Sequence, residues 1–183
     1  MKILVVQNRM GIGDTVIFLP FIEAISKKFN VPVSLLVKKS SKADQYLKQT
    51  DYLENIIFLE RNNKKDEKHN GILGSIRLAQ ELKKNKFDKI FIFNSSLRFN
   101  LIARLANIKE IYQYPLFKKT NQHIIQPAKN LIQKNLGINI FEDPQIGINS
   151  YLIKEAVLKF NIKSDELNIL LGIGGSGSTK RIP

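Results

Sequence analysis

The chain of 183 residues contains no cysteine and no tryptophan, and it has only two histidines. Without cysteine it can form neither a disulfide nor a cysteine-ligated metal site, so a reducing compartment is expected. No stretch approaches the roughly 18 uncharged apolar residues that a membrane-spanning helix needs. The apolar run at the N-terminus is too short for a secretory signal. We therefore expect a cytoplasmic protein.

Acidic residues are scarce: 16 Asp and Glu stand against 29 Lys and Arg, which gives a formal net charge of +13. Such a surplus favours anionic partners, namely nucleic acid, phosphorylated substrates or acidic lipid surfaces. Compositional drift is the alternative explanation, because Lys, Asn and Ile are all plentiful. No segment interleaves aromatic residues with arginine as stacking-type RNA binders do, so we expect no nucleic-acid partner.

Apolar patterns of two kinds alternate along the chain. Short, nearly unbroken apolar runs predict buried strands, and apolar residues at helical spacing predict helices between them. This alternation predicts an α/β fold with a doubly wound parallel sheet, with 109–114 at its edge. The expected strands are 2–7, 31–38, 55–60, 87–94, 109–114 and 169–174. The expected helices are 15–29, 41–50, 72–85, 96–107, 123–138 and one near 150–160.

Two features qualify these elements. Pro20 conflicts with the interior of a helix, so helix 15–29 is either kinked there or has Pro20 in its first turn. The lysine-rich segment 61–70 is expected to be a solvated loop. Ligands of such sheets bind at the carboxyl ends of the strands. The turns after Val6, Asn94 and Ile173 are therefore the places to look for a site.

The first of these turns contains Gly11, Gly13 and Asp14, after a buried strand and before a helix. The glycines allow tight backbone conformations and close approach of a ligand. A dinucleotide fingerprint would need a third glycine at position 16, which is Val16, so dinucleotide binding is not expected. Asp14 has two interpretations: an N-cap of the following helix, or a general base at the edge of the sheet.

Other polar residues near the strand ends also have two interpretations. Arg9 and Arg98 could bind an anionic acceptor, or they could be exposed cations of a turn and a helix. His123 opens a predicted helix, where it is a surface or capping residue or else faces a cleft. His69 lies in the charged segment 61–70 and is expected to be solvated.

The loop at 172–183, "GIGGSGSTKRIP", resembles a phosphate cradle, because small residues expose backbone N–H groups and a lysine adds positive charge. It is not a P-loop, since Thr179 precedes Lys180 rather than following it. An exposed tail is the alternative. The candidate phosphate-binding residues are Ser176, Ser178, Thr179 and Lys180.

Taken together, these segments resemble the bacterial heptosyltransferases of glycosyltransferase family nine. "ILVVQNRMGIGDTVIFLPFIEAISKKF" resembles the N-terminal signature of that family, with its strand, Gly-Asp turn and helix with an early proline. "FDKIFIFNSSLRFNLIARLANIKEIYQY" is similar to the middle segment of the family. "HIIQPAKNLIQKNLGI" is similar to a helix that ends in Leu-Gly, and "GIGGSGSTKRIP" to the nucleotide-sugar loop.

The resemblance implies a GT-B architecture, in which two Rossmann-like domains face each other across a cleft. Residues 1–150 would form the acceptor-binding domain and 151–168 a connector. Residues 169–183 would form the first strand and phosphate loop of a nucleotide-sugar-binding domain. We therefore expect the chain to be a fragment, inactive alone, that lacks the rest of the second domain.

The same resemblance implies roles for individual residues. Asp14 would be the catalytic base of an inverting transfer from an ADP-sugar, with ADP-heptose as donor substrate rather than cofactor. Lys180 and Ser176 would meet the donor diphosphate, and no metal would be needed. The acceptor would be lipid-linked or of the lipopolysaccharide-core type, with possible peripheral contact to the inner membrane.

The sequence departs from the family pattern at two places, and other functions stay open. Ile182 stands where a tryptophan is common, and Asn94-Ser95-Ser96 stands where Gln-Gly is frequent, so the acceptor can differ. One alternative is a non-catalytic binding module for an anionic ligand or membrane surface. Another is a nucleotide-binding regulator or nucleic-acid partner that uses the positive charge.

Overall fold

A computed structural model describes residues 1–61, 67–116 and 123–170. The chain divides into two compact units, residues 1–146 and residues 147–183. Each unit is treated by itself below. No helix in the described residues is both long and apolar enough to cross a membrane.

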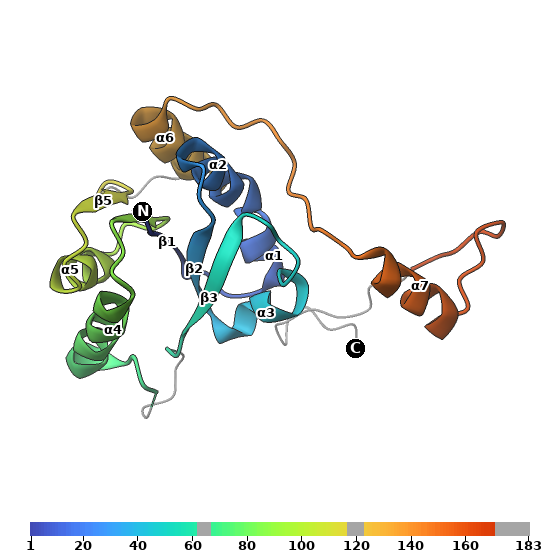
Figure 1. Cartoon of the computed structure of the whole chain (residues 1–183), viewed down its shortest axis with the longest axis horizontal. Coiled ribbons are helices and arrows are strands. Elements are labelled where there is room, and N and C mark those ends of the chain that lie inside the picture. Colours follow the sequence, from blue (N-terminus) through green and yellow to red (C-terminus); the bar gives the residue numbers. More distant parts are fainter. Residues whose placement is uncertain (62–66, 117–122, 171–183) are drawn as a thin grey trace. The chain divides into compact units, whose positions relative to one another are not determined.

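The first unit is built on a five-stranded sheet (Figure 1). The strand order is β3-β2-β1-β4-β5, and every neighbouring pair is parallel. This confirms the predicted Rossmann-like α/β fold, with 109–114 supplying an edge strand. The strands are β1 (Ile3–Gln7), β2 (Val33–Lys38), β3 (Leu53–Leu59), β4 (Lys89–Ile92) and β5 (Glu110–Gln113).

The predicted helix 15–29 is two helices, α1 (Ile12–Val16) and α2 (Leu19–Phe29). The chain breaks between them, and Pro20 lies in the first turn of α2. A proline is tolerated there because the first N–H groups of a helix have no intrahelical partner. Of the two alternatives for Pro20, the structure therefore supports the first-turn position.

Most of the remaining predicted helices are present, with one exception. The segment 41–50 forms only a 3₁₀ turn, η1 (Lys39–Ser41), and the short α3 (Ala43–Tyr46), so the prediction of a full helix there is wrong. Gly137 caps α6 in the left-handed conformation, with φ of 71°. The longer helices are α4 (Gly71–Asn85), α5 (Leu97–Leu105) and α6 (Ile125–Leu136).

Both faces of the sheet are covered, as Figure 1 shows. On one face α1, α2 and α6 pack on the odd-numbered residues of β1, Ile3 and Val5. On the other face α4 and α5 pack on Leu4 and Val6. Because a parallel sheet is buried on both sides, β1 reads as a continuous apolar run rather than an alternating one.

The second unit contains one helix in its described part, α7 (Ser150–Lys159), capped by the side chain of Asn149. No residue of α7 is buried. A strand was predicted over 169–174. Ile169 and Leu170 are exposed and lie outside the sheet, and the rest of that prediction falls outside the described residues.

Candidate functional site

The carboxyl ends of β1 and β4 lie next to each other at the centre of the sheet. From β1 the chain continues to β2 on one side, whereas β4 leads to β5 on the other, so this is the point at which the topology switches direction. Crevices at such points bind ligands in open α/β sheets. The side chain of Asn94 donates a hydrogen bond to that of Asn8 over 3.1 Å and so joins the two turns.

Gln7 holds the first turn closed. Its side chain is almost fully buried at the end of β1. The amide nitrogen donates to the backbone oxygen of Asp14 over 2.6 Å, and the amide oxygen accepts from the backbone N–H of Arg9 over 2.7 Å. The sequence analysis did not single out Gln7. Its signal was a lone amide at the end of an otherwise apolar strand.

The two glycines of this turn play different parts. Gly11 is the N-cap of α1 and has φ of 103° and ψ of 161°, a conformation that only glycine adopts without strain. Gly13 is the second residue of α1, and a Cβ there would meet no atom within 4 Å. The space beside Gly13 is therefore open.

Asp14 is the third residue of α1 and is half-buried. Since Gly11 occupies the N-cap, the capping interpretation of Asp14 is wrong. The carboxylate makes no hydrogen bond or ion pair with any described residue, and only its backbone oxygen is engaged, by Gln7. A carboxylate at the carboxyl end of β1 that no described side chain neutralises is the feature that a general base requires.

Arg9 is exposed beside this turn. Burial raises the pKa of the Tyr114 hydroxyl, and the positive charge of Arg9 lowers that pKa by a smaller amount. The Tyr114 hydroxyl is buried and has no hydrogen-bond partner among the described residues. Tyr114 also lines a cavity of about 480 Å³ between β5 and α6. Arg9 is thus placed where an anion at the sheet edge would meet it.

An amide network fixes the turn after β4. The side chain of Gln113 donates to the backbone oxygens of Asn94 and Ser96 over 3.1 and 2.9 Å. Asn100 donates in turn to Gln113 over 3.0 Å. The turn 94–96 is therefore held by β5 and α5 as well as by Asn8, which makes it a rigid wall beside Asp14.

Arg98 is already engaged. Its guanidinium donates to the backbone oxygen of His69, and burial followed by the charge of Arg61 lowers its pKa. The guanidinium thus ties α5 to the segment before α4. The structure brings Arg9, Gly11, Gly13 and Asp14 into one turn, but it gives Arg98 a structural partner of its own.

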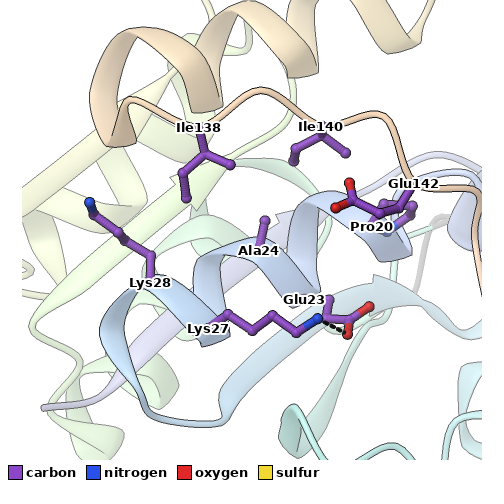
Figure 2. Close-up of a pocket in the computed structure, with 8 residues that line it drawn as sticks. All are labelled: Pro20, Glu23, Ala24, Lys27, Lys28, Ile138, Ile140 and Glu142. Atoms are coloured by element: carbon purple, nitrogen blue, oxygen red, sulfur yellow. Dashed lines mark ion pairs between the residues drawn. The ribbon is translucent and has the colours of Figure 1, made fainter.

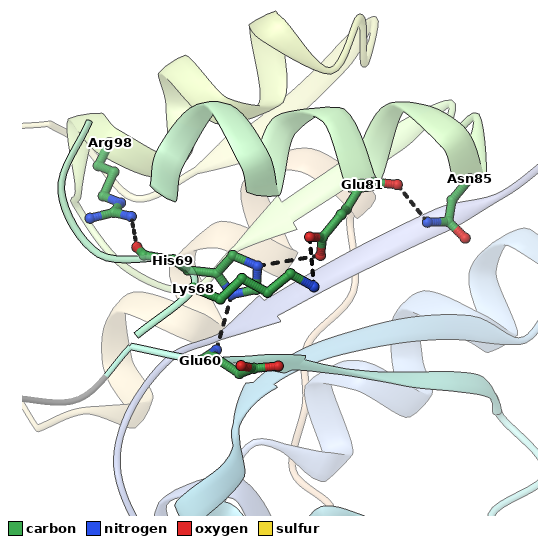
Figure 3. Close-up of polar contacts among 6 residues, drawn as sticks. All are labelled: Glu60, Lys68, His69, Glu81, Asn85 and Arg98. Carbon is green, nitrogen blue, oxygen red and sulfur yellow. Dashed lines mark hydrogen bonds and ion pairs between the residues drawn. The ribbon is translucent and has the colours of Figure 1, made fainter. Parts of the chain in front are cut away.

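The prediction that His69 is solvated is wrong, because its side chain is only 1% exposed. Figure 3 shows its contacts. Nδ1 accepts from the backbone N–H of Glu60 over 3.0 Å, which leaves the proton on Nε2, 3.3 Å from a carboxylate oxygen of Glu81. Lys68 pairs with the same carboxylate at 2.8 Å. Burial raises the pKa of Glu81, but Lys68 and His69 outweigh that effect and lower it overall.

A second hollow lies away from this edge, between α2 and the segment after α6 (Figure 2). It measures about 310 Å³ and is lined by Ile138 and Ile140 together with charges of both signs. Glu23 and Lys27 pair across one helical turn at 2.7 Å, and Glu142 lies opposite them. Hydrogen bonds from its own N–H and that of Phe141, and then Lys27, lower the pKa of Glu142. The charges are mutually compensated, so this groove does not select an ion.

The remaining predicted residues divide as follows. His123 is exposed at the surface before α6. No cluster of three or more His, Cys, Asp or Glu that could hold a metal occurs within 1–61, 67–116 and 123–170. The predicted donor residues Ser176, Ser178, Thr179 and Lys180 lie outside the described part of the chain.

Comparisons with known proteins give a fold and no family assignment from sequence. No family model matches the chain, and no curated protein matches it. Among solved structures, a glycosyl transferase family 9 protein from Veillonella parvula superposes with a TM-score of 0.73 at 18% identity. That match covers 100% of this chain and 56% of the other.

Two Escherichia coli proteins are also similar. ADP-heptose lps heptosyltransferase II gives a TM-score of 0.64 at 12% identity, over 90% of this chain and 52% of the other. Heptosyltransferase WaaC with ADP-2-deoxy-2-fluoro heptose gives 0.55 at 16%, over 90% and 56%. The chain thus spans about half the length of these structures. At such low identity, the likeness shows that the fold is shared.

Proposed function

We propose that the protein is an inverting, metal-independent glycosyltransferase. It would move a heptose or a similar sugar from an ADP-sugar to a lipopolysaccharide-type acceptor in the cytoplasm. Residues 1–146 would form the acceptor-binding side of a two-domain enzyme. Residues 169–183 would open the side that binds the nucleotide sugar, and the first unit by itself would not catalyse transfer because the reaction needs both walls of the cleft.

One observation carries this proposal: the position of Asp14. Its carboxylate stands at the carboxyl end of β1, beside the switch point, and no described residue pairs with it. The fold likeness adds support, because the similar structures include one solved with an ADP-heptose analogue. The open space at Gly13 leaves room for an acceptor hydroxyl next to the carboxylate.

The proposed reaction uses the residues of the chain as follows. The Asp14 carboxylate takes the proton of an acceptor hydroxyl as that oxygen attacks the anomeric carbon of the donor sugar. The bond from this carbon to the diphosphate breaks on the opposite face, and ADP leaves with the electron pair. Lys180 and the hydroxyls of Ser176, Ser178 and Thr179 would stabilise the charge on the departing diphosphate.

Acceptor binding would fall to the first turn. Arg9 is exposed beside it and can meet an acidic or phosphorylated sugar, while Gly11 and Gly13 let the acceptor approach the backbone. Arg98 would act through the segment that it holds at His69 rather than by direct contact.

The experiment is a transfer assay with ADP-heptose and a lipopolysaccharide-core acceptor, followed by mass spectrometry. It uses the complete translation product of the gene that encodes this chain. Asp14→Asn should lower the transfer rate by about a hundredfold or more, the usual contribution of a general base, while the affinity for ADP-heptose stays unchanged. Asp44→Asn is the matched control, because Asp44 also lies in the first turn of a helix, but in α3. Full activity of the Asp14→Asn variant would overturn the proposal.

A further inference from the structure

The outer side of α4 and α5 exposes aliphatic side chains in a group. Isolated apolar residues at a surface need no explanation, but a contiguous group of them marks an interaction site. Six residues of these two helices are between 41% and 81% exposed. They are Ile72, Leu73, Ile76, Leu97, Leu101 and Leu105.

Helical spacing places these residues on one surface. In α5, Leu97, Leu101 and Leu105 recur every four residues and form a stripe, while Phe99, Ile102 and Ala103 face the core. In α4, Ile72 and Ile76 are likewise one turn apart, and the buried side is formed by Gly74, Leu78, Ala79 and Leu82. The apolar residues that cover the sheet are thus distinct from those left outside.

The two stripes adjoin. Figure 1 shows α4 and α5 side by side, and Arg98 at the start of α5 bonds to the segment that leads into α4. Both helices follow strands of a parallel sheet, so they run in the same direction. Their exposed aliphatic residues therefore form one surface rather than two separate patches.

The polar residues around this surface are almost all cationic. Arg77, Lys83, Lys84 and Arg104 are exposed on α4 and α5. The only acid in the two helices is Glu81, which already pairs with Lys68 and contacts His69. A second copy of the chain would bring the same positive charge to this surface and would be repelled. A negatively charged lipid surface would be attracted.

We propose that this outer side of α4 and α5 docks on an anionic phospholipid membrane. The exposed aliphatic residues would enter the boundary between head groups and acyl chains, and the arginines and lysines would meet the phosphates. Interfacial helices combine these same two components, and neither alone gives stable binding.

Docking in this way would also orient the candidate site, a consequence that rests on the proposed function. Both helices begin at the carboxyl ends of their strands, so Ile72, Leu73 and Leu97 lie toward the same edge of the sheet as Asp14. A membrane bound there would bring a lipid-linked acceptor to that edge without leaving the bilayer.

The test is sedimentation of the 183-residue chain with vesicles, either equimolar phosphatidylglycerol and phosphatidylcholine or phosphatidylcholine alone. The triple variant Ile72→Gln/Leu73→Gln/Leu101→Gln should weaken binding to the anionic vesicles by about tenfold or more, because it removes apolar area that the membrane would bury. Circular dichroism would check that the variant remains folded.

A matched control comes from the second unit. Leu152, Leu158 and Phe160 are also exposed, so Leu152→Gln/Leu158→Gln/Phe160→Gln removes comparable apolar area from α7 and the residue that follows it. This variant should change vesicle binding by less than about twofold, within the scatter of surface substitutions. If it abolishes binding while the α4 and α5 variant does not, the proposed surface is wrong.

Charge gives an independent readout. Each of Arg77→Gln, Lys83→Gln and Arg104→Gln should weaken binding to the anionic vesicles by about fivefold at low salt, and added salt should reduce the difference. Equal binding to phosphatidylcholine alone would contradict the proposal. So would a dimer in solution that the aliphatic triple variant dissociates, since the surface would then join two copies. Asp14→Asn should bind vesicles like the unaltered chain, which separates this proposal from that of the catalytic base.

Discussion

Two polar groups near the carboxyl edge of the sheet differ in what surrounds them. In the turn after β1, the carboxylate of Asp14 has no partner among the described residues. In the segment before α4, both ring nitrogens of His69 and its backbone N–H and oxygen are all engaged. The fully engaged group belongs to the framework of the fold, whereas the unpaired one is available to a substrate.

The difference follows from burial. An imidazole that is 99% removed from solvent must have its hydrogen bonds satisfied, because an unpaired buried polar group costs about 1–3 kcal/mol. A half-buried carboxylate keeps access to water and needs no protein partner to remain charged. Substitutions that separate stability from activity therefore test whether the two groups have these different roles.

The largest effect on stability is expected for Gly74→Ala, beside His69. A Cβ at Gly74 would lie 2.2 Å from the backbone carbonyl carbon of His69, and backbone cannot move aside as a side chain can. We expect the free energy of unfolding to fall by about 3 kcal/mol, measured by urea denaturation.

Gly13→Ala is the control for that substitution, because it places the same methyl group on a helical glycine in the Asp14 turn. The added Cβ meets nothing within 4 Å there, so stability should stay equal or rise by up to about 1 kcal/mol. Equal losses from the two substitutions would show that the contact between α4 and His69 is not close.

His69→Leu should give the next largest loss, about 2 kcal/mol, since the backbone N–H of Glu60 then has no acceptor in a buried place. The other histidine supplies the comparison: His123 is exposed, and His123→Leu should change the free energy of unfolding by less than about 0.5 kcal/mol. If both substitutions cost the same in urea denaturation, His69 is not part of the framework.

The sequence predicted the sheet well and the polar contacts poorly. The five strands of the first unit could be predicted because parallel strands buried on both faces are continuous apolar runs, as in "ILVVQ". The chemistry expected of Gly11 and Asp14 also followed from their place after such a strand. These features depend on local pattern, which one sequence contains.

The failures involve contacts between distant segments. His69 was taken as solvated because its neighbours are charged, yet Glu60, Glu81 and Arg98 converge on it from three elements. The segment 41–50 has helical spacing, but only a short helix forms there after the turn at Lys39–Ser41. Neither outcome is encoded in spacing alone, since both depend on how elements pack.

The smallest of these losses in stability is expected for Gln7→Met, which tests the support of the Asp14 turn. Methionine fills a similar volume but cannot bond the backbone of Asp14 or Arg9. The free energy of unfolding should fall by about 1.5 kcal/mol, and sugar transfer should slow because Asp14 loses its support. Gln80→Met on the exposed side of α4 is the control, with no change expected in either measurement.

The most direct measurement pairs the transfer rate with the free energy of unfolding for Asp14→Asn and His69→Leu. Asp14→Asn should lose about a hundredfold or more in rate and change stability by less than about 0.5 kcal/mol. His69→Leu should lose stability, while the molecules that remain folded keep most of their transfer rate. Stability lost in Asp14→Asn with an unaltered rate per folded molecule would contradict the assignment of Asp14 as the base.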